Sequence, residues 1–391
     1  MIKKIPLKEV KIGMCLAESV KTNTGVVIFN NNFYFTSRNQ IVKLLDLGIK
    51  HVSVNLAQSL YNDKTEAEKK RTIYDAKKEF ENPEKRIEKM KEVIIETKDI
   101  FDQGDKVVQD IMESARFGKA LNKKAIRDET TKILQNIQKD PLVSLALLDL
   151  KNFDEYTFIH SINVAVLSVA FAYHIKFPEE KVISVGQGSI LHDIGKARIP
   201  VDVLNKPDKL NDSEFRIMQK HPNLGVQVIE SDMIDNQIIK EIILHHHESY
   251  DGSGYPSKIG SEDMKRFASI VSVADFYDAL TTKRPYKEVI PPANAVKTIF
   301  NLKGRKFDPR VVNHFVKTIG IYPIGSIVDL SDGRVATVIA FSKEFLLQPV
   351  VKVISTKGQD EIISLMNSDI YILGINSDHT LKTLDSFTKK K

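Results

Sequence analysis

The chain has 391 residues, enough for two or three domains, of which 42% are hydrophobic and 28% charged. The net charge is only +6 and the basic residues are spread along the chain, so nucleic-acid binding is not indicated, although an anionic ligand would suit this charge. One cysteine, Cys15, excludes an internal disulfide framework and fits a reducing compartment.

The chain shows neither a signal peptide nor a membrane span. The opening sequence MIKKIPLKEVKIGMCL lacks a continuous apolar run. The apolar segment 161–175, SINVAVLSVAFAYHI, is too short to cross a membrane and contains Asn163 and His174. We therefore expect a buried helix at 161–175 and a cytoplasmic protein.

Residues 1–61 are expected to form a small α+β domain. The sequence GVVIFNNNFYFTS contains two β-rich pieces around Asn30–Asn32. A helical pattern follows at 38–50, and HVSVNL at 51–56 is typical of a strand.

Residues 62–130 change in character and predict a charged helical linker. Asn82 and Pro83 suggest a helix start, with the asparagine as cap and proline in the first turn. Apolar residues then recur at helical spacing, namely Ile87, Met90, Ile94 and Phe101. This stripe favours a helix packed on its own domain, and a homodimer or signal-transmitting helix is the alternative.

Residues 131–320 carry long helical patterns and all of the candidate chemistry. Residues 321–375 turn to β structure, with Asp332-Gly333 as the turn of an expected hairpin, and 376–391 form a basic tail. The expected fold is mainly α: a helical bundle with a small α+β N-terminal domain and a small β-rich C-terminal module.

Seven of the ten histidines fall between residues 160 and 247. A lone buried histidine is ordinarily structural, but several of them on separate helices, together with carboxylates in apolar segments, need another explanation. Asp193 and Asp275 lie in such segments, and buried charge is costly unless it is paired or ligated. A metal centre would satisfy them.

Imidazole and carboxylate ligands without thiolate favour Fe, Mn, Zn, Co or Ni over Ca or Mg. A site with this many ligands can hold two ions, the usual arrangement for in-line attack on phosphorus. Asp193 is our candidate for the bridging ligand because it lies between the ligand sets. Lys196, three residues later, is expected on the same face, where it can reach a phosphate oxygen, unless it is only an exposed helix-end lysine.

Five segments in this region closely resemble the HD-GYP domain, a bacterial branch of the HD phosphohydrolase superfamily. They are DEYTFIHSINVA (154–165), LHDIGKARIP (191–200), QKHPNLG (219–225), HHESYDGSGYP (246–256) and SVADFYDALTTKRPYK (272–287). The resemblance covers about 135–318. The flanking segments resemble, more loosely, the modules found beside this domain in one HD-GYP architecture.

The resemblance implies a helical domain that hydrolyses cyclic dinucleotides, chiefly cyclic di-GMP, with two transition-metal ions, Fe or Mn. It implies a set of metal ligands: His160, His192, Asp193, His221, His246, His247 and Asp275. It also implies substrate contacts at Asp154, Lys196, Asp278, Arg284 and Lys287. Asp193 and Lys196 would carry the catalysis.

One position departs from the family pattern. Some members hold a third metal through a glutamate four residues before the first ligand histidine, where this chain has Tyr156. Glu155 is one residue away and points about a hundred degrees aside on a helix, so two ions are favoured over three. Outside the ligand set, His245 and His174 are expected to support or pack, and the turn 251–256 to form a lid where a signalling protein could bind.

The leading hypothesis is hydrolysis of cyclic di-GMP by a hydroxide that bridges the metal ions, giving linear pGpG and, after a second cut, GMP. One alternative keeps this chemistry and takes 3′,3′-cyclic GMP-AMP as substrate. The other is a cyclic-dinucleotide receptor that binds without turnover.

Overall fold

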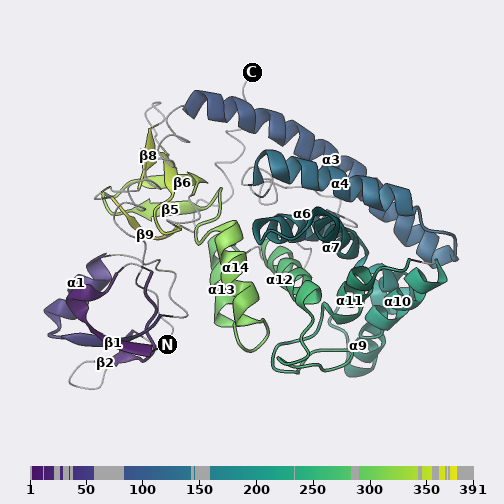
Figure 1. The fold of residues 1–391 in the computed structure, drawn as a ribbon, viewed down its shortest axis with the longest axis horizontal. Helices are drawn as coiled ribbons and strands as arrows, with labels where there is room; N and C mark the ends of the chain where they lie inside the picture. The colour runs from purple at the N-terminus through teal and green to yellow at the C-terminus, as the bar shows by residue number, and fades with distance from the viewer. Residues whose placement is uncertain are drawn as a thin grey trace. The chain divides into compact units, whose positions relative to one another are not determined.

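The computed structural model describes most of the chain, with gaps. The described residues are 2–11, 13–21, 27–29, 35, 38–56, 83–141, 145, 159–232, 234–282, 290–341, 346–354, 361–365, 368 and 370–376. They fall into two compact units, one within Met1–Asn82 and Ile327–Thr380 and the other within Pro83–Ser326. Figure 1 shows the elements of each unit.

The N-terminal part of the first unit is small and mixed α and β. Strands β1 (Ile2–Pro6) and β4 (His51–Asn55) pair antiparallel, as do β2 (Val20–Lys21) and β3 (Val27–Phe29). A 3-10 turn η1 (Leu7–Glu9) and helix α1 (Arg38–Asp46) complete it. The expected helix at 38–50 is confirmed but ends four residues early, because Gly48 takes a left-handed conformation with φ of 74°.

The C-terminal part of the first unit is a five-stranded antiparallel sheet in the order β8-β7-β6-β5-β9. Its strands are β5 (Ile327–Leu330), β6 (Val335–Ala340), β7 (Val350–Val353), β8 (Ile362–Ser364) and β9 (Ile372–Ile375). The predicted hairpin is confirmed: β5 and β6 pair antiparallel around Gly333, whose φ of 84° suits the turn.

The second unit is helical, and two long helices begin it. Helix α3 (Pro83–Phe117) packs against α4 (Lys123–Lys139), where Thr97 Oγ1 and Asn136 Oδ1 lie 2.9 Å apart. Both helices also contact the helices that follow, so they belong to the helical unit. The expected boundary at 130 therefore lies inside α4. Of the apolar stripe, the side chain of Phe101 is described and is buried.

The remaining helices surround a core formed by α6 (Ile159–His174), α7 (Glu179–Leu191), α11 (Gln237–His245) and α12 (Arg266–Thr281). Around it lie η2 (Ile194–Arg198), α8 (Val201–Leu204), α9 (Asp212–Met218), α10 (His221–Ser231), α13 (Pro292–Asn301) and α14 (Pro309–Ile319).

Helix α6 confirms the buried helix predicted at 161–175. Every residue from Ser161 to Ala172 is buried, as expected for a helix that is apolar on all sides. Within the described residues, no helix is both long enough and apolar enough to cross a membrane.

Close backbone packing holds α7 in this core. A Cβ atom added at Gly188 would approach Ile242 Cδ1 of α11 to 2.6 Å, and one added at Gly186 would meet Val169 of α6 at 2.8 Å. A larger residue at either position would have to displace these side chains, so the two glycines let α7 lie close to its neighbours just before His192 and Asp193.

Candidate metal centre

The end of α7 and the start of α10 come together through a glycine. His192 caps the carboxyl end of α7, Asp193 follows it, and η2 begins at Ile194. Within η2, Gly195 lies so close to the carbonyl oxygen of His221 and the backbone nitrogen of Gly225 that no Cβ fits there. This contact brings Asp193 to His221, the first residue of α10.

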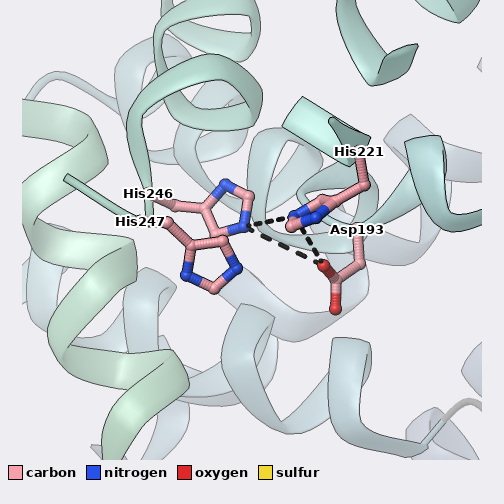
Figure 2. Close-up of side chains that lie close together, drawn as sticks. All are labelled: Asp193, His221, His246 and His247. Carbon is pink, nitrogen blue, oxygen red and sulfur yellow. Dashed lines mark hydrogen bonds and ion pairs between the residues drawn. The ribbon is translucent and has the colours of Figure 1, made fainter. Parts of the chain in front are cut away.

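Four side chains form the cluster that we call cluster A: Asp193, His221, His246 and His247 (Figure 2). Each offers one ligand atom, and these atoms lie within 4.8 Å of one another. His221 Nε2 is 3.3 Å from His246 Nε2 and 3.4 Å from Asp193 Oδ1. His246 and His247 come from the end of α11, so three separate segments supply this cluster.

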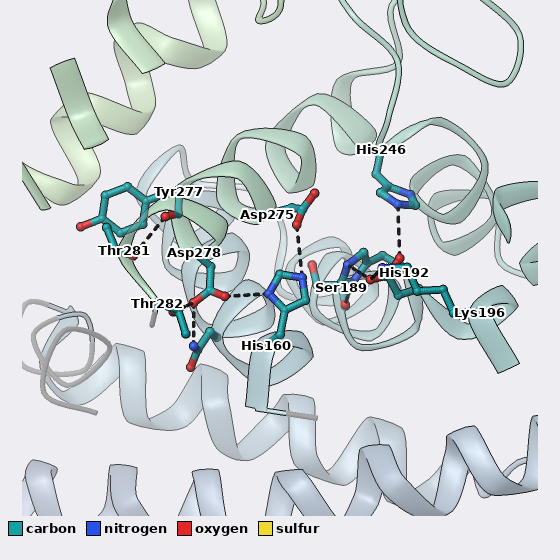
Figure 3. A network of polar contacts seen from close by, with 12 residues as sticks. His160, Ser189, His192, Lys196, His246, Asp275, Tyr277, Asp278, Thr281 and Thr282 are labelled. Carbon is teal, nitrogen blue, oxygen red and sulfur yellow. Dashed lines mark hydrogen bonds and ion pairs between the residues drawn. The ribbon is translucent and has the colours of Figure 1, made fainter. Parts of the chain in front are cut away.

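Three further side chains form cluster B: His160 from α6, His192 and Asp275 from α12. Their ligand atoms also lie within 4.8 Å of one another. His160 Nε2 is 3.2 Å from Asp275 Oδ1, and Figure 3 marks this contact with a dashed line. The seven residues expected as ligands thus gather in two adjacent groups.

Asp193 stands between the two clusters. Its Oδ1 faces the imidazoles of cluster A, while its Oδ2 is 3.2 Å from His192 Nε2 of cluster B. Lys196 Nζ is 2.6 Å from the same Oδ2. One carboxylate can therefore contact both groups and a lysine ammonium at once.

In three of the histidines, hydrogen bonds at Nδ1 leave the Nε2 lone pair available to a metal ion. A backbone carbonyl can only accept, so each Nδ1 that contacts one must donate its proton. The contacts are His192 Nδ1 to Ser189 O at 2.7 Å, His221 Nδ1 to Met218 O at 2.9 Å and His246 Nδ1 to Ile243 O at 3.0 Å. Their Nε2 atoms then carry lone pairs that point into the clusters.

This arrangement fits a metal and is unfavourable without a cation. The facing Nε2 lone pairs of His221 and His246 repel each other at 3.3 Å. Among the described residues, the buried His192 Nε2 and Asp193 Oδ1 have no hydrogen-bond partner. Metal-binding histidines commonly donate their second nitrogen in this way, and imidazole with carboxylate suits a transition metal. The seven side chains can therefore hold metal ions.

Electrostatics prepare cluster A for metal binding. Burial lowers the pKa of His221 to about 4 and that of His247 to about 3, and it holds the pKa of His246 well below its ordinary value. These rings are neutral at physiological pH, which is the state that binds a metal. Burial would raise the pKa of Asp193, but Lys196 and His192 outweigh it and hold that pKa well below its ordinary value.

Cluster B is different because a proton occupies it in the absence of metal. Burial lowers the pKa of His160, but hydrogen bonds to Asp275 and Asp278 outweigh it and raise the pKa to about 10. A metal ion entering cluster B must therefore displace the proton on His160 Nε2.

Comparison with known proteins places this site in a family. An HD domain family model matches residues 123–311, and a model of a domain of unknown function, DUF3391, matches residues 2–126. The chain is 30% identical over 354 residues to cyclic di-GMP phosphodiesterase PA4108 of Pseudomonas aeruginosa, covering 90% of this chain and 85% of that protein. The chain belongs to the HD-GYP family.

A second curated relative and a solved structure are also similar to this chain. The 3′3′-cGAMP-specific phosphodiesterase 2 of Vibrio cholerae is 37% identical over 157 residues, which are 40% of this chain and 30% of that protein. The solved structure of Bd1817, described as a HDG"Y"P protein from Bdellovibrio bacteriovorus, aligns with 81% of this chain and 98% of that one. Its sequence identity is 21% and its TM-score 0.45.

Asp278 lies behind cluster B and contacts His160. Its side chain is only 3% exposed, and its oxygens contact His160 Nδ1 at 2.6 Å, Asn163 Nδ2 at 2.6 Å and Thr282 Oγ1 at 2.8 Å (Figure 3). These contacts show that Asp278 supports the orientation of the His160 ring. The substrate contact that the HD-GYP motif implied for Asp278 stays a prediction.

Several expected residues lie outside the clusters or outside the described residues. Asp154, Glu155, Tyr156, Arg284 and Lys287 fall in segments that the structure does not describe. His245 lies beside Glu248, with 3.8 Å between its Nδ1 and the Glu248 carboxylate, and is not part of either cluster.

The turn 251–256 packs as a wall of the site. A Cβ added at Gly254 would run into the backbone of residues 247–249, so this turn lies directly on the chain that carries His247. The Tyr255 ring packs over His247 with 4.7 Å between centroids. The turn therefore lies against cluster A, and its expected role as a lid stays a prediction.

Two supporting residues were not predicted from the sequence. Asn163 lies one helical turn after His160 and holds Asp278, so its spacing was a usable signal. Glu248 is completely buried and accepts a hydrogen bond from the backbone nitrogen of Ser257 at 2.6 Å. Its role depends on how the following turn folds back, which no spacing indicates.

Proposed function

We propose that this protein is a metal-dependent phosphodiesterase that hydrolyses cyclic di-GMP to linear pGpG, with GMP after a second cut. The observation that carries the proposal is a single carboxylate, Asp193, between two His-and-Asp clusters with a lysine on the same oxygen. The relatives support the substrate. PA4108, which aligns with 90% of this chain, is named a cyclic di-GMP phosphodiesterase.

Two metal ions, Fe or Mn, would occupy the clusters. Cluster A would hold one through His221, His246 and His247, and cluster B the other through His160, His192 and Asp275, with Asp193 shared. Bound ions would supply Lewis acidity and an activated water for in-line attack on phosphorus. Borderline imidazole ligands, carboxylates and the absence of thiolate support Fe or Mn.

The side chains of this chain would do the remaining work. Asp193 fixes the spacing of the two clusters, while Asp278 holds the His160 ring in the orientation that points Nε2 inward. Lys196 is 32% exposed, so its ammonium can turn from Asp193 to a phosphate oxygen and stabilise the charge that develops there. By motif, Asp154, Arg284 and Lys287 would contact the substrate as well.

A second substrate has a specific observation in its favour. The relative from Vibrio cholerae that is 37% identical over 157 residues is named as specific for 3′3′-cGAMP. The clusters act on the phosphodiester that both dinucleotides share, so the same chemistry would serve either substrate.

The test combines metal analysis with turnover. Protein purified without oxygen should contain about two Fe or Mn ions per chain and convert cyclic di-GMP to pGpG. His192→Ala with Asp193→Ala should remove metal and activity while helicity stays nearly intact. A double variant that still hydrolyses cyclic di-GMP would refute the shared-carboxylate site.

The same assay separates the alternative functions. Binding of cyclic di-GMP by metal-loaded protein without any product would identify a receptor. Faster cleavage of cyclic GMP-AMP than of cyclic di-GMP would reassign the substrate.

A further inference from the structure

Helix α9 carries an exposed aromatic ring although the helix buries nothing of its own. None of its residues from Asp212 to Met218 is buried, and Phe215 is 47% exposed. Exposing such a ring to water is unfavourable, by about 25 cal/mol for each Å². A short helix without buried residues ordinarily needs other contacts to hold it in place.

Polar contacts hold α9 in position. Asn211 and Glu214 form a capping box, in which the Asn211 side chain accepts from the Glu214 backbone nitrogen and Glu214 accepts from the Asn211 backbone nitrogen. Lys206 Nζ lies 2.7 Å from the Glu214 carboxylate. The helix is therefore fixed by its polar face, and Phe215 is left facing outward.

A single aromatic ring, that of Tyr255, lies between Phe215 and cluster A. The Phe215 centroid is 6.3 Å from that of Tyr255, at an interplanar angle of 79°. Tyr255 in turn packs over His247 and lies 6.3 Å from His221, both in cluster A. A row of rings thus runs from cluster A through Tyr255 to the exposed face of Phe215.

We propose that Phe215 is a base-stacking residue of the substrate site, which receives a purine ring of the bound cyclic dinucleotide. The inference rests on the proposed function, because it assumes that a dinucleotide phosphate lies at the clusters. The purine bases of such a ligand lie outside its phosphate–sugar ring, so a flat apolar surface beside the clusters suits them. Aromatic side chains bind bases of any sequence by stacking, which fits a ligand whose two bases are purines.

Another exposed phenylalanine provides a matched control. Phe117, at the end of α3, is 68% exposed and lies within the same helical unit. Among the described residues, its ring contacts the Lys119 ammonium at 5.8 Å and no group of either cluster. Removing this ring removes a comparable apolar surface without touching the proposed stacking position.

The experiment compares Phe215→Ala, Phe215→Leu, Phe215→Trp and Phe117→Ala in the full-length, metal-loaded protein. KM and kcat are measured with cyclic di-GMP, and Kd with its non-hydrolysable phosphorothioate analogue. Loss of one stacked base should raise KM and Kd roughly tenfold or more in Phe215→Ala, with kcat within about twofold of wild type. Phe215→Trp should stay near wild type, as should Phe117→Ala.

Phe215→Leu separates stacking from general packing, because leucine keeps apolar bulk without a flat face. It should weaken binding nearly as much as alanine while retaining the full metal content. Wild-type affinity in both Phe215→Ala and Phe215→Leu would overturn the proposal, as would an equal loss in Phe117→Ala or a loss of metal in the leucine variant. If wild-type protein neither binds nor cleaves the dinucleotide, the proposed function itself fails, which is a different result.

Discussion

The histidines of the two clusters differ in what holds their second ring nitrogen. In His192, His221 and His246 a backbone carbonyl accepts from Nδ1, whereas in His160 the acceptor is the carboxylate of Asp278. A carboxylate partner increases the basicity of the ring more than a carbonyl does. His160 is therefore the ligand whose metal affinity depends most on a single replaceable side chain.

Replacing Asp278 with asparagine should weaken metal binding in cluster B selectively. The removal of such supporting partners typically lowers metal affinity about 10- to 100-fold. We expect Asp278→Asn to lose one of two ions on dialysis while cluster A keeps the other, as measured by inductively coupled plasma mass spectrometry. Asp329→Asn is the control, because Asp329 pairs with Asn376 in the β sheet. Equal metal content in both variants would contradict the role given to Asp278.

Replacing Lys196 should reduce the rate and spare the metal. Its ammonium contacts only one oxygen of Asp193, so the clusters keep their ligands in Lys196→Ala. We expect kcat for cyclic di-GMP to fall about 100-fold, the usual scale for losing one donor to a developing anion. Lys132→Ala is the control, since Lys132 also pairs with a carboxylate three residues before it, that of Glu129 on α4. Unchanged kinetics would leave Lys196 as a simple partner of Asp193.

The sequence predicted the metal ligands, but it did not predict the residues that support them or lie beside them. The seven histidines and aspartates could be recognised because metal chemistry restricts the residue types at each motif. The contact of Asp278 with His160 could not be predicted, since it depends on how α12 packs on α6. Tyr255 and Phe215 meet through segments forty residues apart, so their contact leaves no local pattern.

Among the elements, η2 is held close to α10, because Gly195 packs against the backbone of that helix. A side chain at this position must push η2 and α10 apart, which would separate Asp193 from His221. We expect Gly195→Ala to lower the melting temperature by several degrees and to lose metal from cluster A. Gly374→Ala is the control, because an added Cβ there meets no atom within 4 Å. A fully metallated Gly195→Ala protein would show that α10 is not fixed by this contact.

Helices α3 and α4 show what the sequence reveals at this scale. Charge density and the apolar stripe predicted a helix in the region of α3, but they did not predict what that helix packs against. Contacts of both helices with α6, together with the burial of Phe101, place them on the helical unit. The same stripe would have suited a partner chain, and a periodic pattern does not specify what covers it.

For the molecule as a whole, the metal-free protein should be most stable near pH 6.5. The pKa of His221 is about 4 when folded and about 6.5 when unfolded, so the unfolded chain binds more protons between these values and stability falls as pH drops. The pKa of His160 is raised to about 10, so the stability it contributes is lost as pH rises toward 10.

Thermal unfolding of chelator-treated protein from pH 4.5 to 9.5 measures this dependence. The melting temperature should decline on both sides of the maximum. Metal-loaded protein should be more stable throughout and should lack the alkaline decline, because His160 then binds metal in place of its proton. A melting temperature of metal-free protein that climbs steadily above pH 7 would contradict the state assigned to His160.

Cluster B combines His192 with residues from the first and the last of the site-bearing helices, since His160 lies in the first turn of α6 and Asp275 lies in α12. Almost half of the helical unit lies between these two residues in sequence. During synthesis, the ribosome must therefore release the chain beyond Asp275 before this pocket can exist. The complete set of cluster B ligands forms only after α12 has docked on α6, so an ion can be acquired there only afterwards.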